Sequence, residues 1–352
     1  MKSRNLDFFY QKLNTKKISF PLSAHLELTY RCNLKCPHCF CKGSENKGNE
    51  LNTTQIKRLI SSLRREGCIW LTLTGGEPLI REDFLDIYVY AREKGFLVTL
   101  FTNALGFNKK TIDYLTKSPP YAIEITVNSI NKENYEKITR VNGSFSLAMM
   151  NIAFLIQRKL PVIIKSNLLK RNKNEIAGIK QWAEKVLGKP GNKHYFKCDP
   201  LIYPRLNGDK TPCKYRLSPK EIFAVFKQDQ DISSECQDGR FKDAPELPRQ
   251  RKYLFQCDAG KNKVFIDPFG RLRYCVFFQE YSVNLRDASL KKSFSTINPR
   301  VLSQEFNSDS KCQDCALRPV CRWCPARAYL EAGEREKPVR FFCELAKSGV
   351  LN

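Results

Sequence analysis

Residues 23–41 read SAHLELTYRCNLKCPHCFC, and the interpretation of the whole chain starts from them. Side chains alternate over residues 23–30 as they do in a half-buried strand. Cys32, Cys36 and Cys39 follow at once, in the spacing Cys-x3-Cys-x2-Cys. Three thiolates that converge from one loop can hold three irons of a four-iron cluster and leave the fourth iron open to a chelating ligand. The stretch therefore predicts a strand that ends in an iron–sulfur loop.

The same spacing leaves a mononuclear zinc site open as an alternative. A structural zinc takes four ligands, so the fourth would have to be His38 or Cys41. Both crowd against the other ligands, and His38 lies between Cys36 and Cys39. The spacing by itself favours iron–sulfur over zinc.

Strand-like and helix-like segments alternate after this loop. The expected strands cover residues 69–74, 96–102, 121–127, 161–167 and 194–197, and the expected helices cover 52–65, 82–94, 109–117, 131–138, 145–158, 174–187 and 218–227. Capping boxes open the first helix at Asn52 and the last at Ser218. Six strand–helix units predict either a parallel α/β barrel or a doubly wound sheet, and the periodicity does not choose between them. In both, the active site lies at the carboxyl ends of the strands.

The composition narrows the class of protein. The chain has 352 residues, and 60 Lys and Arg against 36 Asp and Glu give a net charge of +24. No stretch approaches the roughly 20 apolar residues of a membrane span, and no apolar core of a secretory signal follows the charged residues 1–5. We therefore expect a cytoplasmic protein that does not enter a membrane. The charge indicates either a solvated Lys-rich surface or an acidic partner.

The distribution of residue types suggests four parts. We expect a basic N-terminal extension over residues 1–22, a strand–helix domain over 23–228, a polar linker over 229–256 and a small cysteine-rich domain over 257–352 with little helix apart from 326–332. Fifteen cysteines in tight clusters fit metal ligation in a reducing compartment better than disulfides.

Two further motifs close the strands that follow the cysteine loop. Thr74-Gly75-Gly76-Glu77-Pro78 ends the second expected strand, and Thr102-Asn103-Ala104 ends the third. The cysteine loop and the Gly-Gly-Glu-Pro turn together resemble the radical S-adenosylmethionine (SAM) superfamily over residues 25–230. The resemblance implies a partial, laterally open (β/α)6 barrel. It also implies an enzyme that cleaves SAM reductively to a 5′-deoxyadenosyl radical.

The resemblance assigns cofactor roles residue by residue. Cys32, Cys36 and Cys39 would bind a [4Fe–4S] cluster, and SAM would chelate its open iron. Phe40 would pack near the adenine. The remaining implied contacts are Gly75, Gly76 and Glu77 for the methionine amino group, Asn103 as a ligand contact or a plain turn former, Thr126 and Asn128 for the ribose, and Arg140 for the carboxylate or as a plain surface arginine. The family's usual sequence at this place is Ser-Leu-Asp-Gly, whereas this chain has Thr126-Val127-Asn128-Ser129. This difference weakens the assignment of a ribose-binding role to Thr126 and Asn128.

The tail holds a second set of cysteines: Cys257, Cys275, the run Cys312-x2-Cys315-x5-Cys321-x2-Cys324, and Cys343. This order of spacings resembles the SPASM domain, which carries two auxiliary clusters, and the likeness covers residues 257–346. It implies Cys257, Cys275 and Cys324 for the first auxiliary [4Fe–4S] cluster, and Cys312, Cys315, Cys321 and Cys343 for the second. Spacing alone leaves two structural zincs as an alternative. Residues 258–263 lack the eighth cysteine of some members, so an open iron in the first auxiliary cluster is a hypothesis.

Other features refine these expectations. Val276 stands where sulfatase-maturing relatives carry an acid, which counts against formylglycine formation. The five remaining thiols are interpreted as ordinary core or surface side chains: Cys41, Cys68, Cys198, Cys213 and Cys236.

Three functions follow, from two classes of protein. The first is oxidative modification of a peptide or protein substrate, as in maturation of ribosomally made peptides. The second is the same chemistry on a small molecule, such as tetrapyrrole side-chain decarboxylation or alcohol dehydrogenation. A basic zinc protein that binds nucleic acid is the third, and no nucleic-acid-binding motif supports it. Both enzymes need a low-potential electron donor such as a flavodoxin or ferredoxin. A peptide-modifying enzyme would also need a separate leader-peptide-binding protein, because residues 1–22 leave no room for such a domain.

Overall fold

The computed structural model describes residues 21–44, 49–188, 195–228, 252–255, 257, 260, 263–307 and 309–349. The expected N-terminal extension and linker lie almost entirely outside these residues, and so does Cys236. The boundaries of these two parts therefore stay predictions.

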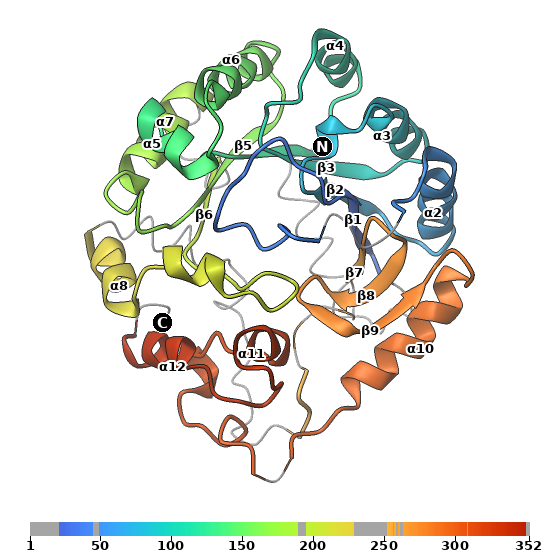
Figure 1. Cartoon of the computed structure of the whole chain (residues 1–352). Helices are drawn as coiled ribbons and strands as arrows, with labels where there is room; N and C mark the ends of the chain where they lie inside the picture. Colours follow the sequence, from blue (N-terminus) through green and yellow to red (C-terminus); the bar gives the residue numbers. More distant parts are fainter. Residues whose placement is uncertain are drawn as a thin grey trace.

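Six parallel strands form the first part of the sheet. They are β1 (Ser23–Thr29), β2 (Trp70–Gly75), β3 (Leu97–Thr102), β4 (Ala122–Thr126), β5 (Val162–Asn167) and β6 (Phe196–Asp199), and they lie side by side in chain order. A doubly wound sheet would reverse its strand order in the middle. The order found here has no reversal, so of the two predicted folds the partial barrel is the observed one. The helices lie outside the arc of strands (Figure 1).

Local sequence signals place the helices of the barrel. These are α2 (Thr53–Arg65), α3 (Phe84–Glu93), α4 (Lys109–Lys117), α5 (Lys132–Thr139), α6 (Ser144–Gln157), α7 (Ile176–Leu187) and α8 (Pro219–Gln228). At α2 the Asn52 side chain accepts a hydrogen bond from the Gln55 amide at 2.9 Å, and the Gln55 side chain accepts one from the Asn52 amide at 3.0 Å. The capping box predicted there is confirmed.

The tail continues the same sheet. β7 (Lys263–Ile266) pairs with β1 in parallel, and β8 (Arg271–Cys275) and β9 (Phe278–Asn284) follow in antiparallel order. One hydrophobic core includes Leu26 and Leu73 of the barrel together with Phe278 and Phe342 of the tail. The tail is therefore packed onto the barrel as part of one folded unit.

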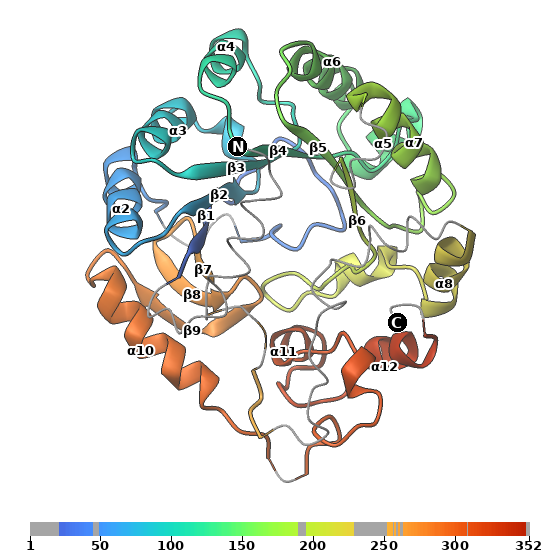
Figure 2. The same ribbon diagram turned by 180° about the vertical axis from the view of Figure 1, so that it is seen from behind.

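Three helices complete the tail: α10 (Leu290–Leu302), α11 (Pro325–Ala332) and α12 (Arg340–Lys347). The expectation of little helix outside 326–332 is wrong for α10 and α12. Helix α10 contains Pro299 and many polar residues, so its sequence does not look helical. Its apolar residues nevertheless form one buried face, which consists of Leu290, Phe294, Ile297 and Val301. Both views place β7–β9 beside β1, and α12 packs against α8, so the tail lies across the opening between the first and last barrel strands (Figure 2). No helix in the described part of the chain is long and apolar enough to cross a membrane.

Candidate radical site and auxiliary cysteine sets

The cysteine loop follows β1 and is fixed on two sides by backbone hydrogen bonds. The Gly76 amide donates to the Thr29 carbonyl at 2.7 Å, and the Glu77 amide donates to the Arg31 carbonyl at 2.9 Å. On the other side, the Lys35 amide donates to the carbonyl of Thr139, the last residue of α5, at 2.9 Å. The loop is thus held between the β2 turn and the end of α5.

The two glycines of the turn have a packing reason that the sequence did not reveal. A Cβ at Gly75, where φ is +133°, would lie 2.2 Å from the Thr29 carbonyl oxygen, and one at Gly76 would lie 2.3 Å from that of Arg31. These are backbone atoms of β1 and the cysteine loop, so neither position has space for a side chain. The resemblance places both glycines at the methionine amino group, and the close approach of this backbone is a second reason for glycine at both positions.

The three thiols of the loop lie within electrostatic reach of one another. Burial raises the pKa of Cys36 above its ordinary value, and negative charge on Cys39 and Cys32 raises it further. Among the described residues, no three His, Cys, Asp or Glu side chains are arranged to hold a single metal ion. The thiols form an all-sulfur donor set in which mutual repulsion opposes ionisation, and a bound cation would relieve that repulsion.

Glu77 connects the ends of two neighbouring strands. It is fully buried. Its Oε1 accepts hydrogen bonds from the Leu79 amide at 3.0 Å and the Thr102 hydroxyl at 2.7 Å, and its Oε2 accepts one from the Asn103 amide at 2.7 Å. Burial raises the pKa of Glu77 to about 7, although these hydrogen bonds lower it. The carboxyl group therefore joins the turn after β2 to the end of β3, next to the cysteine loop.

Asn103 forms a turn and also contacts the cysteine loop. Its Oδ1 accepts a hydrogen bond from the Leu105 amide at 2.9 Å. Its Nδ2 donates to Asn33 Oδ1 at 2.7 Å and lies 3.7 Å from Cys32 Sγ. Asn103 is therefore a turn former that also contacts the cysteine loop, and its contact with a ligand stays a prediction.

Asn128 links the ends of β4 and β5 to the cysteine loop. The side chain is buried, its Oδ1 accepts a hydrogen bond from the Asn167 amide at 2.8 Å, and its Nδ2 lies 3.4 Å from His38 Nε2. Thr126, at the end of β4, is half-buried. Both implied ribose contacts therefore lie at the carboxyl edge of the barrel.

Arg140 lies at the end of α5. It follows α5 in a left-handed conformation, with φ of 58°, and is exposed. Its guanidinium donates to the Tyr215 hydroxyl at 3.0 Å. The neighbouring Thr139 contacts the cysteine loop, whereas the Arg140 side chain lies on Tyr215, and its role toward a carboxylate stays a prediction.

Two polar groups near the loop were missed as site residues. Tyr135 of α5 is 1% exposed, and its hydroxyl has no hydrogen-bond partner among the described residues. Burial raises the pKa of Tyr135, and the charges of Cys36 and Glu77 raise it further, so the phenol lies within electrostatic reach of both residues. His38 Nδ1 is also buried and without a partner among the described residues. A buried polar atom without a partner costs about 1–3 kcal/mol, so both atoms fit a site that receives a polar ligand.

The seven tail cysteines gather in two sets. Burial raises the pKa of Cys275 to about 12, and the charges of Cys324 and Cys257 raise it further. Burial raises the pKa of Cys312 to about 11, and here Cys343, Cys321 and Cys315 add to the effect. This grouping is the one that the resemblance implies. Whether the two sets bind clusters stays a prediction.

An aromatic contact joins the cysteine loop to the first tail set. Phe40 follows Cys39, and its ring centroid lies 5.3 Å from that of Phe277. The Phe277 amide donates to Cys275 Sγ at 3.4 Å, and the Tyr203 ring lies 4.6 Å from the Phe277 ring. The set formed by Cys257, Cys275 and Cys324 is therefore adjacent to the barrel loop. The predicted contact of Phe40 with adenine remains untested.

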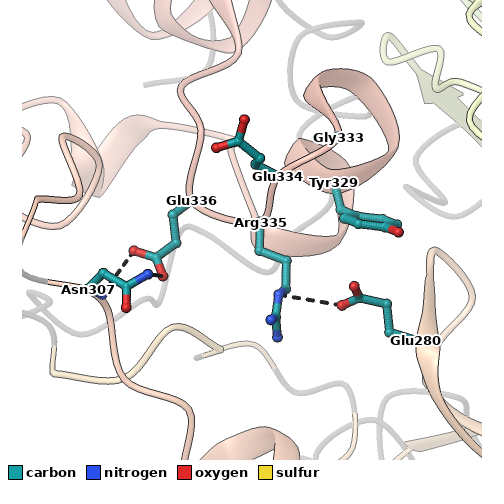
Figure 3. A pocket seen from close by; sticks show the side chains of 7 residues that line it. All are labelled: Glu280, Asn307, Tyr329, Gly333, Glu334, Arg335 and Glu336. Atoms are coloured by element: carbon teal, nitrogen blue, oxygen red, sulfur yellow. Dashed lines mark hydrogen bonds and ion pairs between the residues drawn. The ribbon is translucent and has the colours of Figure 1, made fainter.

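A separate cavity of about 320 Å³ lies in the tail (Figure 3). Arg335 lies 3.4 Å from Glu280 across it, and Asn307 donates to Glu336 at 2.8 Å. The residues that the structure places around the cavity include no cysteine. It is distinct from the site at the barrel edge.

Comparison with known proteins identifies the family. Residues 26–183 match the model of the radical SAM superfamily. These residues form a radical SAM domain. The tail of the chain is of the SPASM type, and the cofactors of the superfamily are a [4Fe–4S] cluster and SAM. The all-sulfur loop and the two unpartnered polar atoms beside it fit these cofactors.

Two relatives align over most of this radical SAM chain. The AdoMet-dependent heme synthase of Methanosarcina barkeri is 24% identical over 327 residues, which are 88% of this chain and 92% of the relative. The antilisterial bacteriocin subtilosin biosynthesis protein AlbA of Bacillus subtilis is 26% identical over 320 residues, which are 88% of this chain and 68% of the relative.

Solved structures share the fold. SuiB of Streptococcus suis bound to SAM superposes with a TM-score of 0.69 at 16% identity and covers 97% of this chain and 79% of that one. The enzyme anSMEcpe with bound AdoMet gives a TM-score of 0.66 at 14% identity, with 93% and 95% coverage. At this identity the likeness concerns the fold alone.

Proposed function

We propose that this radical SAM enzyme oxidatively modifies a peptide or protein substrate. When bound, the cluster and SAM supply reductive cleavage to a 5′-deoxyadenosyl radical and hydrogen abstraction from the substrate. The observation that carries the proposal is the arrangement of the tail, where the set of Cys257, Cys275 and Cys324 lies against the barrel loop through Phe277 and Phe40. An acceptor at this place suits an oxidative modification, because hydrogen abstraction leaves one electron to remove.

The names of several similar proteins support a peptide substrate. AlbA takes part in the biosynthesis of the bacteriocin subtilosin. SuiB has been solved with its precursor peptide SuiA, and anSMEcpe with two different peptides. The net charge of +24 would favour an acidic peptide or an acidic partner.

The roles of this chain's residues follow from their positions. Cys32, Cys36 and Cys39 would hold the radical-site cluster. Glu77 keeps the ends of β2 and β3 in place beneath it, and Asn128 fixes the end of β5 against His38. The hydroxyl of Tyr135 and the buried nitrogen of His38 would receive hydrogen-bond partners from the bound cofactor. The tail lies across the open side of the barrel and would limit the access of water to a reactive radical.

The proposed enzyme depends on other proteins. It would receive electrons from a low-potential donor such as a flavodoxin or ferredoxin. We also propose that a separate protein binds the leader segment of the peptide substrate.

A second candidate function is the same chemistry on an acidic tetrapyrrole. The observation that favours it is the heme synthase of Methanosarcina barkeri, 92% of which aligns with this chain. A substrate with several carboxylates would also suit the basic surface.

The test uses anaerobically reconstituted protein with SAM and dithionite. Candidate substrates are short peptides encoded beside the gene and an iron porphyrin, with products followed by mass spectrometry. A mass loss of two hydrogens or a new crosslink in a peptide supports the first function, and loss of carboxyl groups from the porphyrin supports the second.

Two cysteine variants locate the chemistry. Cys32→Ala/Cys36→Ala/Cys39→Ala is expected to abolish 5′-deoxyadenosine formation, because no thiol of the loop remains. Cys312→Ala/Cys315→Ala is expected to keep 5′-deoxyadenosine formation while losing product. Continued cleavage of SAM by the triple variant would overturn the assignment of the radical site.

A further inference from the structure

Each tail cysteine set contains one arginine that no motif predicted. Arg318 begins the short 3-10 helix η4 (Arg318–Val320) between two cysteines of the second set. Its amide donates to the Cys315 carbonyl at 2.9 Å, and its carbonyl accepts from the Cys321 amide at 3.3 Å. Arg327 lies in the first turn of α11, directly after Cys324 of the first set.

Aromatic rings fix both guanidinium groups. Arg318 Cζ lies 4.3 Å from the ring centroid of Trp323, whose indole nitrogen donates to the Lys337 carbonyl at 2.9 Å. Arg327 Cζ lies 4.7 Å from the ring centroid of Tyr203, and its Nη1 donates to the Arg322 carbonyl at 2.9 Å. Planar stacking of this kind suits arginine and holds its orientation.

Neither guanidinium has a carboxylate in contact. Among the described residues, no ion pair involves Arg318 or Arg327, and the Nε of each is buried without an acceptor. A buried cation without a counter-charge is unfavourable, and a buried N–H without an acceptor adds to the cost. Both observations point to an anionic partner that accepts a hydrogen bond at each place.

Both arginines interact electrostatically with thiols of the two sets. The charge of Arg318 opposes the rise that burial causes in the pKa of Cys312 and of Cys321. Burial would lower the pKa of Arg327, but Tyr203, Cys324, Asp199 and Cys275 raise it above its ordinary value. Arg318 therefore lies mainly in the field of the second set, although Cys324 of the first set also acts on it. Arg327 lies in the field of the first set, with Asp199 as a further acidic group.

We propose that Arg318 and Arg327 are positioning residues that would raise the reduction potentials of the two auxiliary clusters, each by its fixed positive charge and by a buried Nε–H that is free to donate to a bound cluster. The inference rests on the proposed function, since it requires clusters in the tail. A cluster that takes up one electron becomes more negative by one charge, and a nearby buried cation stabilises that reduced state. Arginine stays protonated throughout, so the effect persists at every working pH.

The experiment uses full-length protein that carries Cys32→Ala/Cys36→Ala/Cys39→Ala, so that only tail clusters contribute. Arg318→Gln and Arg327→Gln remove the charge, and Arg318→Lys and Arg327→Lys keep it. Arg300→Gln is the matched control, because Arg300 is exposed and lies 4.7 Å from the Tyr281 ring in the same tail. Potentials are measured by redox titration followed with electron paramagnetic resonance. Cys312→Ala/Cys315→Ala identifies which signal belongs to the second set.

Arg318→Gln is expected to shift the signal of the second set more than that of the first, and Arg327→Gln the signal of the first set more than that of the second, in each case to a more negative potential. The lysine variants should shift less, and Arg300→Gln should shift neither. Unchanged potentials in glutamine variants that retain their iron would overturn the inference and leave the proposed function intact. Loss of iron from the lysine as well as the glutamine variants would also overturn it, because packing would then be the role. A parent protein without tail iron would instead contradict the proposed function itself.

Discussion

The cysteine loop of the barrel and the cysteine sets of the tail are assembled in different ways. The loop takes its three thiols from residues 32–39 and is held by main-chain hydrogen bonds to the β2 turn and to α5. The tail sets draw thiols from the end of β8, the start of α11 and the middle of α12, so they exist only once the tail has folded. We therefore expect the cysteine loop to be sensitive to substitutions in the backbone that contacts it. The tail sets, whose cysteines lie on separate elements, depend instead on the side-chain packing between those elements.

The two regions also differ in charge. In its ionised form the fully buried carboxyl group of Glu77 acts on Cys32 of the loop and on Tyr135, while each tail set lies in the field of a guanidinium. Negative surroundings disfavour uptake of an electron and positive surroundings favour it. The difference suits a strongly reducing cluster in the barrel and electron-accepting clusters in the tail.

The largest expected effect comes from Gly76→Ala in the turn that holds the loop. Its Cβ would lie 2.3 Å from the Arg31 carbonyl oxygen and 2.7 Å from that of Tyr30, and neither backbone atom can move without displacing the cysteine loop. We expect destabilisation by about 3 kcal/mol or more, together with loss of loop-bound iron. Urea unfolding and iron analysis measure the two effects.

Gly178→Ala is the matched control for this substitution. Gly178 lies inside α7, where the nearest atom to an added Cβ is Ile130 Cδ1 at 3.8 Å. Alanine should stabilise this helix by about 1 kcal/mol. Equal stability of the two variants would show that the turn does not press on the cysteine loop as the structure indicates.

The barrel was largely predictable because its signals are local. The expected helix over 109–117 coincides with α4, and the capping boxes at Asn52 and Ser218 open α2 and α8. β7 escaped prediction because it is short and is stabilised by parallel pairing with β1, from the other end of the chain. Tyr135, Arg318 and Arg327 escaped because nothing in their local sequence distinguishes a side chain at a site from one in the core or on the surface.

An intermediate effect is expected from Glu77→Gln, which tests the acidic group beside the loop. Burial raises the pKa of Glu77 to about 7 from an ordinary value of 4.5. A raised folded-state pKa means that the stabilisation is complete below about pH 4.5 and is lost as the pH rises through 7. The loss amounts to about 3 kcal/mol at most. Glutamine resembles the protonated acid, so the variant should lack this part of the pH dependence.

The measurement is urea unfolding of iron-free protein between pH 4.5 and 8, for the parent and for Glu77→Gln. Glu27 shares the behaviour, because burial also raises its pKa to about 7, and it stays in both proteins. The difference between the two curves therefore isolates Glu77. A difference that stays constant with pH would mean that Glu77 is not the titrating group.

The smallest effect is expected from removal of a single buried hydroxyl group, at Tyr135 of the site or at Tyr88 of the core. The Tyr135 hydroxyl is buried and has no partner among the described residues, whereas the equally buried Tyr88 donates to the Ser118 carbonyl at 2.7 Å. Removing an unpaired buried hydroxyl should stabilise iron-free protein by about 1 kcal/mol, and removing a paired one should destabilise it by about the same amount. Urea unfolding of Tyr135→Phe and Tyr88→Phe measures both. If Tyr135→Phe is as destabilising as Tyr88→Phe, the phenol already has a partner in the empty protein, and its place in the radical site loses its support.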